Sequence, residues 1–236
     1  MSLLAWNRHN CVAIVNLYTT YFCDPNEFRR SEVLSCLLRN LELDAIDAVY
    51  VFAENIAPPV SHVKLNCRIC KTRPRFDQFF QWINENNRNG DSVSVVCNSD
   101  IFFDKSIILA TSLLKGRSCL ALSRWDIDAN DRAVLFECGD SQDTWIFNGA
   151  IDVQNIGNYP LGVYDCDNKI AWELERSGYK VTNPSLSLRT YHLHRTSYRS
   201  YDPSSPSRHG ITPPFLYIEP DNAGSLSECV LLWAKH

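Results

Sequence analysis

Residues 92–100 read Ser-Val-Ser-Val-Val-Cys-Asn-Ser-Asp, an apolar segment that runs directly into amide, hydroxyl and carboxylate side chains. The β-branched first part predicts a buried strand over residues 92–97. In open α/β sheets ligands gather at the carboxyl ends of strands, which is where Asn98, Ser99 and Asp100 stand. Oxygen ligands there suit Mg²⁺ or Mn²⁺, and a turn capped by an Asx side chain explains the same residues equally well.

Strands and helices alternate before this segment. Apolar residues recur at helical spacing after Asp24-Pro25-Asn26-Glu27, which reads as a helix start with Asp24 as the N-cap, and again from Phe76 to Ile83. Strands are predicted at residues 12–17, 48–53 and 63–67, the first followed by a polar turn at residues 18–21. This order predicts an α/β fold with a mixed, mostly parallel Rossmann-type sheet flanked by helices.

After residue 105 the order of elements becomes mixed, so antiparallel additions to the sheet are expected. A helix is predicted from about residue 168 to Gly178, where glycine can take the left-handed cap position. Residues 197–214 hold four prolines and many Ser and Arg residues, which predicts a loop. We therefore expect one domain over residues 1–196 and a Pro/Ser-rich loop and C-terminal tail over 197–236 that packs on it.

Composition limits the classes of function. A chain of 236 residues with 45% hydrophobic residues can bury a sizeable core, and a net charge of -4 argues against a nucleic-acid partner. No apolar run approaches the ~20 residues of a membrane span. The first ten residues lack the pattern of a signal peptide, so reduced cysteines and a cytoplasmic location are expected. Cys67-Arg68-Ile69-Cys70 has no second ligand pair, which favours a structural role over zinc binding.

Two more clusters carry chemistry. Asp165-Cys166-Asp167-Asn168 stands directly before a predicted helix, where carboxylates can also serve simply as helix caps. His192 and His194 lie at positions i and i+2 of an extended run, so both imidazoles project from one face and can share a metal or a phosphate. Each histidine alone is more often structural.

The order of these three clusters resembles that of GT-A glycosyltransferases. Asn98-Ser99-Asp100 stands where that family has its DxD motif, Cys166-Asp167 where it has the xED motif with the catalytic base, and His192-Leu193-His194 where it has a C-terminal metal-binding histidine. The resemblance covers roughly residues 12–194 and is one of pattern. Asn98 replaces the first aspartate of the DxD motif, and Cys166 replaces the glutamate before the base.

The resemblance implies roles for particular residues. Asp100 with His192 or His194 would hold Mn²⁺ or Mg²⁺, and Asp167 would deprotonate the acceptor hydroxyl, with Asp143 as the reserve candidate. The implied contacts of the nucleotide sugar are Thr19, Thr20, Tyr21, Glu54, Arg73, Asn98, Ser99, Asp100, Arg124 and Trp125. Arg73 could equally form a surface salt bridge, and Trp125 could equally be a core residue.

The expected function is transfer of a sugar from a nucleotide-diphosphate sugar, with a UDP-sugar favoured, to a glycan or other hydroxyl acceptor. The resemblance implies an inverting, metal-dependent reaction. A nucleotidyltransferase or nucleotide-sugar pyrophosphorylase is an alternative, although residues 18–21 read Tyr-Thr-Thr-Tyr where such enzymes have a glycine-rich loop. A catalytically inactive module that binds sugar nucleotides is the alternative from another class.

Overall fold

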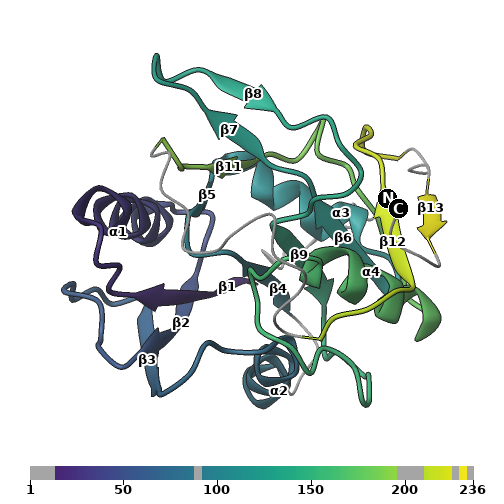
Figure 1. The fold of residues 1–236 in the computed structure, drawn as a ribbon, viewed down its shortest axis with the longest axis horizontal. Helices are drawn as coiled ribbons and strands as arrows, with labels where there is room; N and C mark the ends of the chain where they lie inside the picture. Colours follow the sequence, from purple (N-terminus) through teal and green to yellow (C-terminus); the bar gives the residue numbers. More distant parts are fainter. Residues whose placement is uncertain (1–13, 88–91, 196–209, 225–228, 233–236) are drawn as a thin grey trace, which may run out of the picture.

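The computed structural model describes residues 14–87, 92–195, 210–224 and 229–232. Its core is a seven-stranded sheet with the order β10-β6-β9-β4-β1-β2-β3 (Figure 1). Neighbouring strands are parallel except at β9, which runs antiparallel to both β4 and β6. The predicted mixed, mostly parallel sheet is confirmed. Its strands are β1 (Ile14–Phe22), β2 (Ala48–Glu54), β3 (Leu65–Cys70), β4 (Ser92–Cys97), β6 (Ser118–Leu122), β9 (Thr144–Asn148) and β10 (Lys180–Thr182).

Helices cover both faces of this sheet because alternate strand residues are apolar on opposite sides. On one face Leu17 and Val95 pack with the buried side of α1 (Glu27–Glu42), and the 3-10 helix η1 (Lys105–Leu109) and α3 (Ala110–Leu113) lie on the same side. On the other face Tyr18 and Val96 pack with α2 (Phe76–Asn86) and α4 (Cys166–Arg176). The result is a helix-sheet-helix sandwich that leaves the carboxyl ends of β1 and β4 open.

Local boundaries differ from those expected, and the strand expected at residues 63–67 is β3 at Leu65–Cys70. The first strand continues to Phe22, so residues 18–21 are strand and not turn, because Tyr18 and Tyr21 gain burial in the two cores and the ladder to β2 continues through them. Helix α1 begins at Glu27, and its cap is Asn26, whose side chain accepts the amide of Arg29. Helix α4 begins at Cys166, two residues before the expected start.

A smaller four-stranded sheet lies beside the carboxyl end of β4, with the order β5-β11-β7-β8. It consists of β5 (Ile101–Phe103), β11 (Thr190–His192), β7 (Trp125–Ile127) and β8 (Ala133–Leu135), and the β7–β8 hairpin extends away from the main sheet (Figure 1). Because β5 directly follows Asp100 and pairs with β11, it brings the histidine strand next to the end of β4.

The C-terminal part adds a two-stranded sheet of β12 (Phe215–Ile218) and β13 (Cys229–Leu232). Strand β12 packs on α4, and Phe215 and Ile218 belong to the same buried cluster as Phe76 and Trp145. Of the predicted loop at 197–214, residues 197–209 lie outside the described residues. Among the described helices, none is both long and apolar enough to span a membrane.

Candidate functional site

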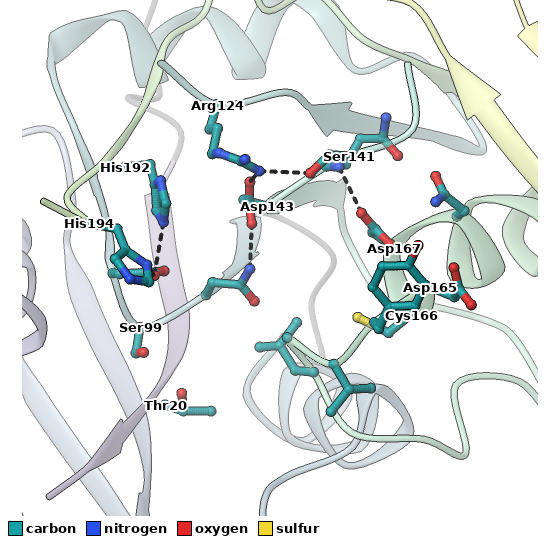
Figure 2. A pocket seen from close by; sticks show the side chains of 18 of the residues that line it. Thr20, Ser99, Arg124, Ser141, Asp143, Asp165, Cys166, Asp167, His192 and His194 are labelled. Atoms are coloured by element: carbon teal, nitrogen blue, oxygen red, sulfur yellow. Dashed lines mark hydrogen bonds and ion pairs between the residues drawn. The ribbon is translucent and has the colours of Figure 1, made fainter. Parts of the chain in front are cut away.

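A cavity of about 490 Å³ opens at the carboxyl ends of β1 and β4. Its lining comes from these two strands, from the loop that leads into α4, from residues 140–143 before β9, and from the end of β11. Figure 2 shows His192 and His194 on one side, Asp165, Cys166 and Asp167 on the opposite side, and Asp143 with Arg124 between them. The three sequence clusters therefore meet in one cavity.

Asp100 is the centre of the cationic side. Its Oδ2 lies 3.0 Å from His192 Nε2 and 3.9 Å from His194 Nδ1, and it also accepts a hydrogen bond from Arg29 Nη2. Burial works against ionisation, yet His192 and Arg29 hold the pKa of Asp100 well below its usual range. The carboxylate is therefore ionised, with three cationic or potentially cationic side chains around one oxygen.

His192 is held in place from its other side. Its Nδ1 lies 2.6 Å from Asp126 Oδ1, so the imidazole bridges Asp126 and Asp100. Burial alone would lower the pKa of His192, but the ion pair with Asp100 and the hydrogen bond that His192 donates to Asp126 raise it to about 9. A histidine whose second nitrogen faces a carboxylate has the orientation commonly found in metal-ligating histidines.

The donor set at this side fits a divalent transition metal. One ligand atom each from Asp100, His192 and His194 can be chosen so that all three lie within 4.8 Å of one another. Two imidazoles and one carboxylate suit Mn²⁺ better than Mg²⁺, which prefers oxygen ligands throughout. The guanidinium of Arg29 shares the Asp100 carboxylate, so bound metal and Arg29 would compete for the same negative charge.

Asp143 occupies the middle of the cavity, and both of its carboxylate oxygens accept hydrogen bonds. Arg124 Nη1 donates to its Oδ2 at 2.9 Å, and Asn98 Nδ2 donates to its Oδ1 at 2.6 Å. The same Arg124 nitrogen also reaches Ser141 Oγ at 2.7 Å. With both oxygens accepting charged or short hydrogen bonds, Asp143 is a poor candidate for a base and a good candidate for fixing Arg124 and Asn98 at the cavity wall.

Asp167 is the carboxylate with base-like properties. It lies in the first turn of α4, and its Oδ2 accepts the backbone amide of Gln142 at 3.2 Å. Burial and, after it, the negative charge of Asp143 raise its pKa to about 7, although backbone amides partly oppose the shift. A carboxylate with a pKa near neutrality can accept a proton at physiological pH and release it again.

The structure separates the remaining sequence candidates into two groups. Arg73, Ser99 and Thr20 line the cavity together with the residues already described. Among the described residues, Arg73 makes no hydrogen bond or ion pair, and its guanidinium lies 6.0 Å from the centre of the Phe22 ring. The residues Thr19, Tyr21, Glu54 and Trp125 are absent from the lining.

Strand geometry explains why Thr19 and Tyr21 are excluded, and side-chain contacts explain why Trp125 is. Because β1 continues through Phe22, Thr20 and Phe22 face the cavity side, whereas Thr19 and Tyr21 point toward the opposite face. The Thr19 hydroxyl lies 3.1 Å from the Cys97 carbonyl oxygen. The Trp125 indole donates to the Ser185 carbonyl at 2.9 Å and is covered by Arg189.

Sequence reasoning assigned no role to several residues of the site. Arg29 carries no local signal because it is a basic residue in the first turn of an amphipathic helix. Asp126 stands with Arg124 and Trp125 at one strand end, and alternation along β7 places it on the same side as Arg124, but its contact with His192 was not predicted. Asp140, Gln142 and Tyr217 belong to loops and a strand whose approach to the cavity depends on tertiary packing.

Comparisons with known proteins give a likeness of fold only. No protein-family model matches the chain, and no curated protein matches it either. Among solved structures, it is similar to the mannosyltransferase PcManGT from Pyrobaculum calidifontis in complex with GDP-Man and Mn²⁺, at 12% identity and a TM-score of 0.49. That alignment covers 79% of this chain and 58% of the mannosyltransferase chain.

Two further structures show how broad the likeness is. GalNAc-T7 with UDP, GalNAc and Mn²⁺ aligns at 9% identity and a TM-score of 0.46, covering 84% of this chain and 46% of its own. The 4-diphosphocytidyl-2C-methyl-D-erythritol synthase from Anaerococcus prevotii aligns at 11% identity and a TM-score of 0.41, covering 72% of this chain and 86% of its own.

Proposed function

We propose that this chain is a nucleotide-sugar-dependent glycosyltransferase that transfers a sugar to a hydroxyl acceptor with inversion at the anomeric carbon. The observation that carries the proposal is the arrangement of the cavity. A cluster of Asp100, His192 and His194 with metal-ligand chemistry stands on one side, and Asp167, a carboxylate with a pKa of about 7, stands on the other. The diphosphate of the donor needs a metal site, and the hydroxyl of the acceptor needs a base.

The cationic side is suited to the donor. Asp100, His192 and His194 would hold Mn²⁺, which when bound neutralises charge that develops on the departing diphosphate. Arg73 and Arg124 line the same cavity, and a guanidinium can bind phosphate with two parallel hydrogen bonds. Thr20 at the end of β1 and Ser99 after β4 place hydroxyl groups where the nucleotide sugar would enter.

The opposite side is suited to the acceptor. Asp167 would accept the proton of the attacking hydroxyl, because its raised pKa keeps it a sufficient base near pH 7. Asp143 would keep Arg124 and Asn98 in place between the two sides. A single in-line displacement, with the base across the cavity from the diphosphate site, inverts the anomeric configuration.

The test is calorimetric titration of UDP-sugars and GDP-sugars with and without Mn²⁺. We expect metal-dependent binding of at least one donor, with UDP-sugars favoured, and loss of the metal dependence in Asp100→Asn. The matched control is Asp128→Asn, a carboxylate on the β7–β8 hairpin that pairs with Arg132 outside the cavity. Absence of nucleotide-sugar binding in the folded wild-type protein would refute the proposal.

The alternative functions have distinct readouts in the same experiment. A nucleotidyltransferase would consume a nucleoside triphosphate and a sugar phosphate and release pyrophosphate, whereas a transferase releases a nucleoside diphosphate. Donor binding without release of either product, over a panel of acceptors, would indicate an inactive binding module.

A further inference from the structure

The acceptor side of the cavity is lined by groups that accept hydrogen bonds. Four carboxylates line it, from Asp140, Asp143, Asp165 and Asp167. Asp143 is neutralised by Arg124, and the other three lie at the loop before β9 and the start of α4. The hydroxyl groups of Ser141, Tyr164 and Tyr217 also line the cavity.

Three amide side chains contribute further hydrogen-bond acceptors to this wall. Each donates its NH₂ group to the protein: Asn98 to the Asp143 carboxylate at 2.6 Å, Gln142 to the Gly139 carbonyl at 2.8 Å, and Asn168 to the Asp140 carbonyl at 2.9 Å. In each case the carbonyl oxygen of the amide is buried and has no hydrogen-bond partner among the described residues. All three residues line the cavity.

The orientation of these amides is fixed by chemistry. A carboxylate and a backbone carbonyl only accept hydrogen bonds, so turning any of the amides round would place two acceptors against each other. The amide oxygens of Gln142 and Asn168 therefore cannot gain a partner by rotation of the amide. These residues are only 1% and 4% exposed, so water does not readily supply a donor. A buried acceptor without a partner costs free energy unless a ligand brings a donor to it.

Resting on the proposed function, we propose that the acceptor is an aminated sugar whose protonated primary amine binds between the start of α4 and the loop at residues 139–143. An ammonium group supplies three N–H donors and one positive charge, and it accepts no hydrogen bond. A neutral hydroxyl supplies one donor and no positive charge. The ammonium thus matches a wall that combines carboxylates with unpartnered amide oxygens.

Glucosamine, glucose and N-acetylglucosamine are suitable probes because they share one ring and differ at a single carbon. Binding is measured by calorimetry on the full chain, first without and then with a nucleotide sugar. We expect glucosamine to bind about tenfold or more tightly than either other sugar, as a charge-assisted hydrogen bond predicts, and to lose affinity as salt increases.

Two substitutions localise the preference. Asp165→Asn removes one charge and keeps the local backbone, because asparagine tolerates the left-handed conformation found there at φ 66°. Asp140→Asn removes another charge at the same wall. We expect each to reduce the preference for glucosamine by about fivefold or more, whereas Asp152→Asn, an exposed carboxylate paired with Arg117, leaves it unchanged.

The outcomes separate this inference from the proposed function. Nucleotide-sugar binding with no preference for glucosamine over glucose overturns the inference and leaves the transferase proposal standing. A preference for glucosamine that Asp165→Asn and Asp140→Asn abolish supports the inference even if no nucleotide sugar binds. A preference retained in both variants overturns it, because the amine then binds elsewhere.

Discussion

At the scale of single residues, the chemistry of this cavity depends on how carboxylates are partnered. Asp100 is surrounded by His192, His194 and Arg29, and it is ionised. Asp167 is buried and lies near the negative charge of Asp143, so its pKa is close to neutrality. Two aspartates of one cavity thus differ in their tendency to bind a proton. When two carboxylates of one site have different pKa values, they commonly take different roles in catalysis.

Asp167→Asn should lower kcat/KM by about 10² to 10⁴, because the acceptor hydroxyl loses its base. In the wild-type protein kcat/KM should rise with pH and level off above about 7, where Asp167 is deprotonated, and this limb should be absent from the residual activity of the variant. A pH-rate profile checks both. The titratable groups whose charges interact with Asp167 are Asp143, Tyr159, Cys166 and Tyr217.

The same substitution carries a stability prediction. Because the pKa of Asp167 rises from 3.8 to about 7 on folding, its ionisation destabilises the folded state progressively between these two values. Asp167→Asn should therefore raise the melting temperature at pH 8 relative to wild type and have little effect at pH 4. Equal shifts at both pH values would contradict the raised pKa.

Asp126→Ala should weaken Mn²⁺ binding by about 10- to 100-fold, because His192 loses the carboxylate that orients its ring. Calorimetry with Mn²⁺ alone, in the absence of any sugar, measures this. Asp128→Ala is the control, since its carboxylate lies two residues further along the same hairpin and pairs with Arg132. Equal weakening in both variants would assign the effect to the hairpin as a whole.

At the scale of elements, the segment that leads into α4 shapes the acceptor side. Gly162 lies in this segment at φ 71°, and a Cβ added there would meet Asn98 Oδ1 at 3.0 Å. The glycine therefore allows a close approach between the α4 segment and the end of β4. The carboxylates of α4 face the cavity because this approach is possible.

Gly162→Ala should reduce nucleotide-sugar or acceptor affinity, because the new methyl group pushes Asn98 away from Asp143. Gly116→Ala is a matched control: its φ is 56°, and a Cβ there has nothing within 4 Å. Both variants should lose about 1 kcal/mol of unfolding free energy from the left-handed backbone. Only Gly162→Ala should weaken binding in calorimetry, and equal weakening in Gly116→Ala would contradict a local cause.

At the scale of the whole molecule, the described C-terminal strands complete the core. Phe215 of β12 is 1% exposed and shares its cluster with Phe76 and Trp145 from distant parts of the chain. Tyr217 of the same strand lines the cavity. We propose that this segment and the main sheet unfold together as one cooperative unit.

Phe215→Ala should lower the free energy of unfolding by about 3–5 kcal/mol, the usual cost of removing a buried phenylalanine side chain. Phe28→Ala is the control on the same residue type, because Phe28 is 77% exposed on α1, and its effect should stay within about 0.5 kcal/mol. Chemical denaturation checks both. A separate low-stability transition in wild type, abolished by Phe215→Ala, would contradict the single unit.

The sequence by itself determined the order of elements and the three clusters of candidate residues. Apolar periodicity depends on near neighbours in the chain, so it located the strand that ends at Cys97, the helix after Asp165 and the strand that carries His192. It misjudged the end of β1, because pairing with β2 extends that strand beyond what the polar residues 18–21 suggest. Thr19 and Tyr21 consequently point away from the cavity that they were expected to line.

Only the tertiary structure decided which side chains meet. Arg29 pairs with Asp100 across 71 residues of sequence, Asp126 with His192 across 66, and Asn98 with Asp143 across 45. These contacts follow from the strand order of two sheets and from the helix positions over them, and no local pattern records that order. The pKa of Asp167 and the unpartnered amide oxygens of Gln142 and Asn168 depend on the same packing, because burial and partnering are properties of the folded chain.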